Sequence, residues 1–347
     1  MRYQKVWMDA IGYQLGELEV SSAVLEKRLA PSYKKLHFPQ GQLEALTGVQ
    51  HRRWWPKGHR LSDGAVAAAR HALAKTDVPI SALGAVVYTA VAREQFEPAT
   101  ACRVAGLLGV EPSTLVFDIS NACLGMLNGM LDVANRIELG QIKAGLVVAC
   151  ESSRDIINEA IAAILADSSM KNMVMWLATL TGGSGAVAVV LTDGSFSHED
   201  KPRLHGASWQ AAPQFHDLCS WGLEEDQPRR FREVMRTDSI PLMKNGVALG
   251  QKTWAVFLKE QGWSAENVDK VICHQVGSSN QKAVLGALQI SLEKDFVTFP
   301  SLGNMGPVSV PLTAAIAAEK DFLKTGDHVA WLGIGSGLNC MMLAFEW

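Results

Sequence analysis

Short apolar runs rich in β-branched residues alternate along the chain with longer, helix-like stretches. Runs of the first kind are typical of buried strands. Their alternation with helical stretches predicts an α/β protein in which helices cover central sheets. The strand-like runs are Ala85–Val91, Thr114–Ile119, Ala144–Ala149, Ala186–Leu191, Val268–Cys273 and His328–Ile334. The helix-like stretches are Asp63–Lys75, Cys123–Leu139, Gly246–Gln261, Asn280–Leu288 and Val310–Lys324.

Two strand–turn–helix units share a layout. The run Leu115–Ile119 leads into a helix that opens near Cys123, and the run Lys270–His274 leads into a second helix. Each unit places a chemically capable residue at its turn. The pattern therefore predicts two similar α/β halves, although their sequences show no convincing identity.

A turn cluster at Thr192–Ser195 lies between apolar segments and predicts the boundary between the halves, residues 1–193 and 194–347. Two further stretches resemble insertions. Ile156–Trp176 has a wide apolar face and predicts one or two helices, whereas Trp209–Arg230 is typical of an irregular loop. Both can line a pocket for an apolar substrate, or pack against the core or a partner subunit.

Composition narrows the class of protein. Of the 347 residues, 48% are hydrophobic and 19% are charged, which is typical of a globular chain with a large core. The net charge of −3, with no long run of one sign, argues against a nucleic-acid or membrane-surface protein. Apolar runs such as Leu83–Ala92 are too short to span a bilayer, and the charged Arg2, Lys5 and Asp9 do not fit a signal peptide. Six scattered cysteines without a C-x-x-C pair predict no metal cluster or disulfide framework, and a cytoplasmic location.

Cys123 is the candidate nucleophile. It lies where a buried strand turns into a helix, between the small residues Ala122 and Gly125. Unpaired N–H groups and partial positive charge at a helix N-terminus favour the thiolate, which is the reactive form of cysteine. The small neighbours allow a substrate carbonyl to approach. The alternative for a single cysteine is a buried structural role.

Two polar residues of the C-terminal half are candidates for the same site. His274 ends the apolar strand Val271–His274, a position from which side chains of α/β proteins reach a cleft. Asn304 lies between Gly303 and Gly306, which permit a tight turn that presents its amide. The alternatives are a structural histidine and an ordinary turn asparagine.

A glycine-rich segment, Gly333–Asn339, follows the last strand-like run before the C-terminus. Its glycines let backbone N–H groups point at a developing oxyanion. The segment lacks the G-x-x-x-x-G-K-S/T pattern of phosphate loops, and no third glycine or ribose-binding acidic residue follows its G-x-G spacing. The sequence therefore gives little support to a nucleotide site.

In this order and spacing, the four segments resemble the thiolase superfamily, and within it the 3-oxoacyl-(acyl carrier protein) synthase III branch. The segment Thr47–Arg53 also looks like the T-G-[IV]-x-x-R-R signature of that branch. The resemblance covers nearly the whole chain. It implies a thiolase fold, with two similar halves in a five-layered α-β-α-β-α arrangement, and an acyltransferase that forms carbon–carbon bonds.

A narrower resemblance is to the OleA-type enzymes of bacterial long-chain olefin synthesis. Arg93–Thr100 resembles the loop that sends a glutamate into the partner subunit's active site, and Glu97 takes the matching position. His274 is followed by Gln-Val as in those enzymes, and the ending Leu332–Cys340 is also similar. Ser336 falls on the position whose backbone N–H helps to form the oxyanion hole. The alternative for Glu97 is a solvated loop carboxylate.

The resemblance implies a non-decarboxylative Claisen condensation of two fatty acyl-CoA thioesters. Cys123 carries the first acyl group, with its own N–H and that of Ser336 on the oxyanion. His274 and Asn304 hold the carbonyl of the second acyl thioester. Glu97 removes the α-proton, provided that burial raises the pKa of its carboxyl. The product is a 2-alkyl-3-keto acid or its thioester.

Three alternatives stay open at this point. One is a synthase III reaction, in which an acyl starter condenses with a malonyl thioester and loss of CO2 supplies the carbanion. Another is a degradative thiolase with a second cysteine as base, for which Cys340 is the candidate. The third is an acyltransferase or a non-catalytic partner subunit on the same fold, and the complete set of Cys123, His274 and Asn304 argues against the non-catalytic role.

Partners and cofactors follow from the resemblance. We expect a homodimer, because a glutamate delivered across an interface requires one, and no metal or redox cofactor. The substrates are acyl-CoA thioesters, with acyl carrier protein as the alternative donor. Arg52 and Arg53, beside Trp54 and Trp55, are candidates to meet the nucleotide end of coenzyme A by charge and stacking. The alternative for the tryptophans is a surface or core position.

Overall fold

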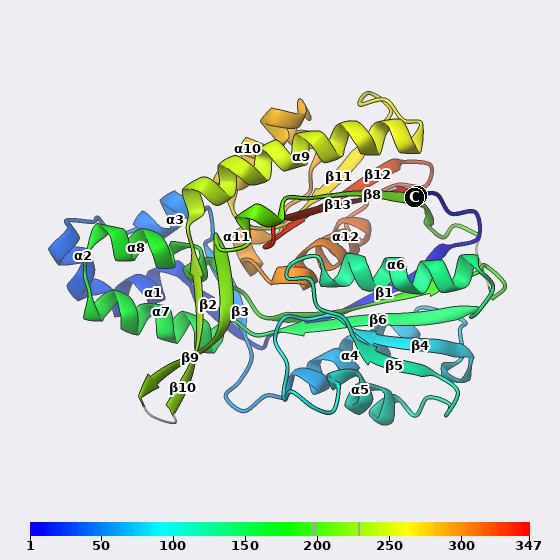
Figure 1. Ribbon diagram of the computed structural model, residues 1–347, viewed down its shortest axis with the longest axis horizontal. Coiled ribbons are helices and arrows are strands. Elements are labelled where there is room, and N and C mark those ends of the chain that lie inside the picture. The colour runs from blue at the N-terminus through cyan, green and yellow to red at the C-terminus, as the bar shows by residue number, and fades with distance from the viewer. Residues whose placement is uncertain (197–198, 228–229) are drawn as a thin grey trace.

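The computed structural model describes residues 1–196, 199–227 and 230–347 as five alternating layers of helices and strands (Figure 1). Nine strands lie in the order β11-β12-β13-β8-β1-β7-β6-β4-β5. Within residues 1–196, 199–227 and 230–347, strands β1 and β8 share one paired position, Trp7 with Arg203, so the sheet divides there into two halves. The predicted five-layered fold of two similar α/β halves is confirmed, and the predicted boundary at residue 193 falls between β7 and β8.

The N-terminal half contains β1, β7, β6, β4 and β5. The last three run parallel, whereas β7 is antiparallel to both β6 and β1. Helices α4 and α5 cover the outer face of this sheet. The bounds are β1 Trp7–Leu15, α4 Leu61–Leu73, β4 Leu83–Tyr88, α5 Thr100–Leu108, β5 Leu115–Asp118, β6 Ala144–Glu151 and β7 Gly185–Thr192, with a short 3-10 turn η1 at Ile80–Ala82.

The C-terminal half repeats this layout with β8, β13, β12 and β11. Strand β12 is parallel to β11 and antiparallel to β13, which is in turn antiparallel to β8. Helices α9 and α10 cover the outer face. The bounds are β8 Arg203–Ala211, α9 Ser239–Gln261, β11 Lys270–Cys273, α10 Ser278–Leu288, β12 His328–Gly335 and β13 Asn339–Glu346, with η4 at Leu292–Lys294.

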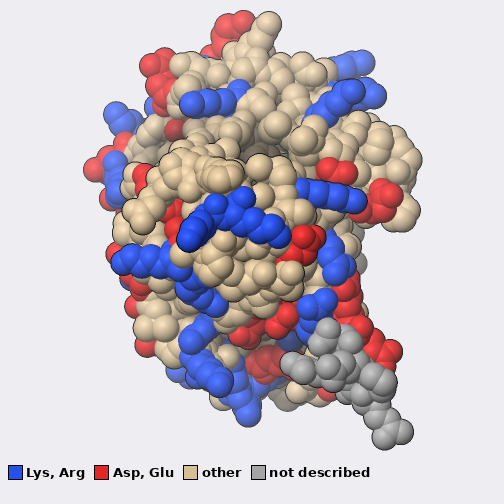
Figure 2. Space-filling view, turned by 90° about the vertical axis from the view of Figure 1, so that its left-hand side faces the viewer, with Lys and Arg blue, Asp and Glu red and all other residues tan. Residues whose placement is uncertain are grey.

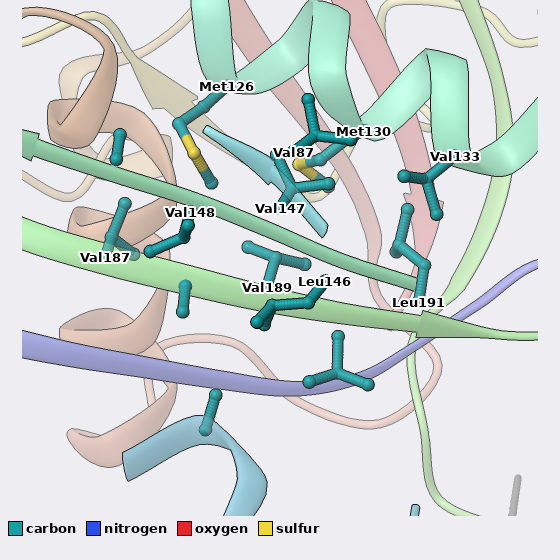
Figure 3. Close-up of a cluster of buried hydrophobic side chains, with 14 of the residues drawn as sticks. Val87, Met126, Met130, Val133, Leu146, Val147, Val148, Val187, Val189 and Leu191 are labelled. Atoms are coloured by element: carbon teal, nitrogen blue, oxygen red, sulfur yellow. The ribbon is translucent and has the colours of Figure 1, made fainter. Parts of the chain in front are cut away.

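Helices α6, at Gly125–Glu138, and α12, at Ser309–Glu319, form the central layer between the two sheets. Figure 3 shows Met126, Met130 and Val133 of α6 lying over the valine-rich strands of the N-terminal half. All three side chains are fully buried, as are Val147 and Val189 beneath them. Burial of such side chains is the main stabilising term for this layer.

Smaller elements extend the two halves on one side. Helices α7 and α8 confirm the prediction of helices within 156–176, whereas the stretch 209–230, predicted to be an irregular loop, contributes strand residues to β8 and to a β9–β10 hairpin. Basic and acidic side chains are interspersed on this face (Figure 2). The bounds are β2 Leu18–Ser21, α1 Ser22–Arg28, α2 Ala30–Leu36, α3 Gln42–Thr47, β3 His51–Trp54, α7 Arg154–Ala166, α8 Met170–Leu177, η2 Thr179–Thr181, η3 Pro213–Phe215, β9 Cys219–Gln227, β10 Arg230–Thr237, α11 Phe299–Leu302 and η5 Gly306–Val308.

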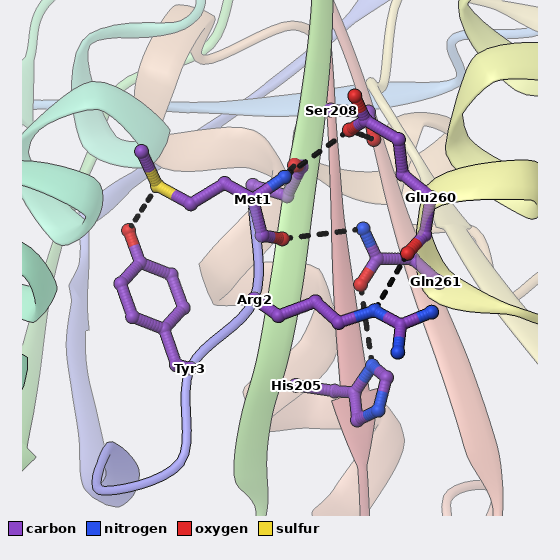
Figure 4. Close-up of polar contacts among 8 residues, drawn as sticks. Met1, Arg2, Tyr3, His205, Ser208, Glu260 and Gln261 are labelled. Atoms are coloured by element: carbon purple, nitrogen blue, oxygen red, sulfur yellow. Dashed lines mark hydrogen bonds and ion pairs between the residues drawn. The ribbon is translucent and has the colours of Figure 1, made fainter.

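The first residues of the chain tie the two halves together (Figure 4). The terminal amine donates to the Glu260 carboxylate of α9, and Arg2 donates to the Glu260 carbonyl. Tyr3 donates to Asn135 of the central helix α6. Among the described residues, no helix combines the length and apolar character needed to cross a bilayer.

Candidate active site

Cys123 lies between β5 and α6, in a turn of fixed geometry. The helix begins at Gly125, two residues beyond the predicted start at Cys123 itself. A Cβ atom at Gly125 would lie 2.0 Å from the carbonyl oxygen of Thr89, so only glycine lets α6 start this close to the end of β4. Ala122 adopts a left-handed φ of 45°, which a residue with a side chain rarely does. The turn thus holds the thiol in one place through a strained backbone.

The thiol of Cys123 is protonated in the free site. Burial, which is the largest cause, and the nearby Cys219 and Glu151 together raise its pKa to about 12, although the N–H of Cys123 itself acts in the opposite direction. The expectation that the helix N-terminus favours the thiolate is therefore contradicted: burial outweighs the one contribution that favours the thiolate, and α6 starts beyond the cysteine. A base must remove the proton when the thiol reacts.

His274 follows β11 at the end of the strand, as predicted. Its N–H donates to the carbonyl of Leu332 on the neighbouring strand. Burial lowers the pKa of the imidazole to about 4, so the ring is neutral at pH 7. The ring Nδ1 is buried without a hydrogen-bond partner among the described residues. A neutral, unsatisfied imidazole can accept the thiol proton or hydrogen-bond to a substrate.

Gln275, the residue that follows His274, has a structural role. Its side chain is buried, donates to the carbonyl of Cys273, and accepts from the N–H groups of Thr298 and Phe299. These bonds fasten the end of β11 to the start of α11. The segment with His274 and the segment that leads to Asn304 are thereby held together.

Asn304 follows α11 in a turn that backbone hydrogen bonds fix on both sides. Its N–H donates to Thr181, and its carbonyl accepts from Gly183. The side-chain Oδ1 accepts from the N–H of Gly306 at 2.9 Å. With Oδ1 engaged in this way, the Nδ2 amine is the donor that the side chain can offer to a ligand.

Ser336 lies in the turn between β12 and β13, beside the Cys123 turn. A Cβ atom on Gly335 would lie 3.4 Å from the backbone nitrogen of Cys123. The side-chain amide of Asn339 donates to Asn121, which precedes Cys123 by two residues. These contacts bring together the two backbone segments from which the oxyanion donors are predicted to come.

Two cavities meet at these residues, and both are lined by Cys123, Asn304 and Ser336. The larger has a volume of about 350 Å³, and the smaller, about 110 Å³, also includes His274. Further lining residues of the larger cavity are Val91, Glu151, Ile156, Ala178, Cys219, Trp221 and Met235. Further lining residues of the smaller one are Cys219, Leu242, Met243, Val247, Val276, Val284 and Ile334. The walls are mostly apolar, and the polar or thiol side chains that both cavities share are Cys123, Cys219, Asn304 and Ser336.

Glu97 lies apart from these cavities in the single chain. It is exposed on the loop between β4 and α5, next to Phe96, whose side chain is 91% exposed. The burial that the predicted base needs is therefore not provided by the residues of its own chain. The structure brings together Cys123, His274, Asn304 and Ser336, and leaves Glu97 at the surface.

Two other predicted positions do not face the cavities. Arg52 is fully buried under β2 and donates to Val20 and Ser22, and burial lowers its pKa to about 10. This placement contradicts the prediction that Arg52 meets coenzyme A. Cys340 is buried in an apolar cluster beneath α9, and burial raises its pKa to about 11. It is not among the described residues that line either cavity of Cys123, but it lines a third cavity of about 50 Å³ that His274 also lines. The second-cysteine alternative therefore keeps a candidate near His274, although Cys340 shares no cavity with Cys123 among the described residues.

Sequence reasoning missed Glu151 and Cys219. Glu151 ends β6 inside the larger cavity, and Cys219 begins β9 and lines both cavities. A signal for Glu151 existed, because an acidic residue directly after an uninterrupted apolar strand occupies the same kind of position as His274. Nothing in the local pattern around Cys219 distinguishes it from the other cysteines.

Fold and cavity together place the chain among the condensing enzymes of thiolase fold. Residues 258–347 match the family model described as 3-Oxoacyl-[acyl-carrier-protein (ACP)] synthase III C terminal. Within that class, the chain belongs to the family of acyl-CoA:acyl-CoA alkyltransferases, or OleA.

The relatives match over their whole length. An acyl-CoA:acyl-CoA alkyltransferase of Shewanella oneidensis is 58% identical over 349 residues and one of Xanthomonas campestris is 33% identical over 348, each covering 100% of both chains. The solved structure of cerulenin-bound Xanthomonas OleA has a TM-score of 0.94 at 33% identity and covers 100% of this chain and 98% of that one. A β-ketoacyl-[acyl-carrier-protein] synthase III of Clostridium novyi is more distant, at 25% identity over 313 residues, covering 87% of this chain and 88% of the relative.

Proposed function

We propose that this enzyme joins two fatty acyl-CoA thioesters head to head in a non-decarboxylative Claisen condensation. The observation that carries the proposal is the pair of mostly apolar cavities that meet at one thiol. One cavity accepts the acyl chain bound to Cys123, and the other accepts the chain of the second substrate. The names of the full-length relatives, acyl-CoA:acyl-CoA alkyltransferases, agree with two acyl-CoA substrates.

In the first half-reaction Cys123 takes the acyl group from one acyl-CoA. The neutral imidazole of His274 accepts the thiol proton as the sulfur attacks the thioester carbonyl. The backbone N–H groups of Cys123 and Ser336 stabilise the oxyanion. The coenzyme A thiolate leaves with the proton that His274 held, and the imidazole is neutral again.

In the second half-reaction the carbonyl of another acyl-CoA binds to His274 and Asn304. A carboxylate removes its α-proton, the carbanion attacks the acyl thioester on Cys123, and the Cys123 thiolate leaves and is reprotonated. The product is a 2-alkyl-3-ketoacyl thioester, which hydrolysis of its thioester bond converts to the 2-alkyl-3-keto acid.

Glu97 is the carboxylate that we assign as this base. Solved variants of Xanthomonas OleA include one with a substituted cysteine and others with a substituted glutamate. In that enzyme the glutamate precedes the cysteine by the same interval that separates Glu97 from Cys123. Of the acidic residues near Cys123, Glu97 alone matches this spacing and the predicted loop.

A homodimer follows from this assignment. Glu97 and Phe96 project from the single chain, and the neighbouring β5 is the outer strand of the sheet, with Leu115 45% exposed. An exposed strand edge and apolar side chains around it favour pairing with another copy. The second copy would bury Glu97 of the first within reach of the second copy's own cavity, away from the solvent that surrounds the loop tip in the single chain.

The test compares the two half-reactions in Glu97→Gln. With acyl-CoA alone and no malonyl thioester, the wild type should give a condensed β-keto product, and the variant should lose roughly 10²–10⁴-fold in condensation rate, as expected for a missing general base. The rate of Cys123 acylation, measured by intact-protein mass spectrometry, should stay within about threefold of the wild-type rate, because the thiol proton goes to His274. A wild type that condenses only when malonyl thioester is added would show the decarboxylative reaction instead.

A further inference from the structure

Glu151 has no role in the reaction as described, yet its carboxyl lies inside the larger cavity with Cys123. It ends β6, and its side chain is 3% exposed. A Cβ atom on Gly306 would lie 3.8 Å from its Oε1, so the carboxyl packs against the turn that holds the Asn304 amide. A buried carboxyl in a mostly apolar cavity is costly unless it makes specific hydrogen bonds.

Among the described residues, the side-chain hydrogen bonds of Glu151 go to the loop that carries Glu97, whereas its backbone carbonyl accepts from the Trp55 indole. Its Oε1 accepts from the N–H of Val91 at 2.6 Å, and its Oε2 accepts from the N–H of Ala92 at 3.3 Å. The hydroxyl of Tyr88 donates to the carbonyl of Ala92 at 3.0 Å, so the next peptide of the loop is also held. The root of the loop is therefore held from within the cavity.

The rest of the loop is held by carboxylates that lie outside the cavities. Glu94 accepts from the N–H and the hydroxyl of Ser62, and Asp118 accepts from the N–H groups of Thr100 and Ala101. The exposed tip, residues 95–98, lies between these anchors. Of the three carboxylates, Glu151 alone contacts both the loop and the space where an acyl chain would lie.

We propose that Glu151 is a positioning residue, which sets the root of the loop at Val91 and Ala92 so that Glu97 at its tip reaches the active site of a second copy in the geometry needed for α-proton removal. This inference rests on the role of Glu97 in the proposed function. A general base must stand within hydrogen-bond reach of the proton that it takes, so a displacement of about 1 Å at the loop root costs rate at its tip. The thiol chemistry of Cys123 does not pass through the loop.

The experiment measures acylation and condensation separately in Glu151→Gln. Glutamine has the size of glutamate, but its amide NH2 cannot accept the second backbone N–H. We expect condensation to fall about 10–100-fold while acylation of Cys123 stays within about threefold. Glu151→Asp, which keeps a carboxyl group but draws it back from both N–H groups, should show the same selective loss and serves as the second variant if Glu151→Gln folds poorly.

Glu26 provides a matched control on α1. It is buried, and its carboxylate accepts from the N–H groups of Gly41 and Leu43, much as Glu151 accepts from Val91 and Ala92. It does not line either cavity. Glu26→Gln should change the ratio of condensation to acylation by less than about twofold, whatever it does to thermal stability. An equal change of this ratio in Glu26→Gln would overturn the positioning role.

A double variant separates this inference from the proposed function. If Glu151 acts through Glu97, adding Glu151→Gln to Glu97→Gln should lower condensation no further. Losses that multiply, or a Glu151→Gln enzyme that condenses normally while Glu97→Gln is inactive, would overturn the positioning role alone. Normal condensation by the single variant Glu97→Gln would overturn the base assignment and the route by which Glu151 acts.

Discussion

The cavity around Cys123 and the loop that carries Glu97 are held in opposite ways. In the cavity, the turns of Cys123, Asn304 and Ser336 are fixed by backbone hydrogen bonds and close contacts to strands of both halves. The loop is anchored at its root and its end, but residues 95–98 at its tip are exposed. One region is complete within a single chain, and the other is not.

In the proposed reaction, this difference assigns the two half-reactions to one chain and to two. Formation of acyl-Cys123 is proposed to need the thiol, a neutral imidazole and two N–H groups, and one chain holds all of these groups. Removal of an α-proton needs a desolvated carboxylate, and the single chain leaves Glu97 in solvent. The comparison predicts that variants of cavity residues stop both half-reactions, whereas variants of the loop stop only the second.

Removal of the nucleophile should have the largest effect. Cys123→Ala should lower acylation and condensation together by at least about 10⁴-fold, because no other group takes the acyl chain. Intact-protein mass spectrometry after incubation with acyl-CoA measures the adduct directly. An acyl adduct of normal yield in this variant, for example on the neighbouring Cys219, would break the assignment of the cavity.

His274→Ala should have the next largest effect. The thiol of Cys123, with its pKa raised to about 12, then lacks a base, and acylation at pH 7 should fall roughly 10²–10⁴-fold. The rate of the variant should rise about tenfold per pH unit between pH 7 and 9, as hydroxide forms the thiolate. The wild type, whose imidazole has a pKa of about 4, should show no such rise. Parallel pH profiles would mean that His274 does not accept this proton.

Much of the fold and of the cavity was predictable because the candidate site residues lie where strand-like or helix-like segments of the sequence end. His274 closes an apolar strand, Cys123 follows one, and glycines flank Asn304. Such positions reach a common cleft in α/β folds. The fold is confirmed, and the cavity contains all three residues, although their catalytic roles stay predictions until the variants are measured.

The errors came from information that is not local. Arg52 alternates with Arg53 along β3, and the pairing of β3 with β2 buries Arg52 on the same face as Trp54. No property of the dipeptide says which arginine points inward. The β9–β10 hairpin was missed because each of its strands is defined by the pairing of Cys219–Gln227 with Arg230–Thr237 and not by its own composition.

Acidification should lower the stability of the folded protein, because His274 is buried in the same cavity. The folded state holds His274 at a pKa of about 4, below the ordinary value of 6.5 that the unfolded chain regains. The unfolded state therefore binds the proton first, and this contribution to stability is complete above pH 6.5 and is lost as the pH falls toward 4. The shift corresponds to roughly 3 kcal/mol. Between pH 7 and 4.5, His274→Gln should lose less thermal stability than the wild type. An identical pH dependence of the melting temperatures would place the imidazole in solvent.

The smallest effect should come from the contact that joins the two oxyanion turns. Asn339 donates to Asn121 at 3.1 Å, and Asn121 donates to Asn128 of α6 at 2.7 Å. Asn339→Ala removes the bond between the turns but leaves the thiol, the imidazole and the loop untouched. A single hydrogen bond contributes about 1 kcal/mol, so acylation should slow about fivefold. Because condensation passes through the same oxyanion site, it should slow by a similar factor, unlike the selective loss expected for the loop. If only condensation slowed in Asn339→Ala, the distinction between a shared cavity and a separate loop would not hold, since a cavity contact would then behave as a loop contact does.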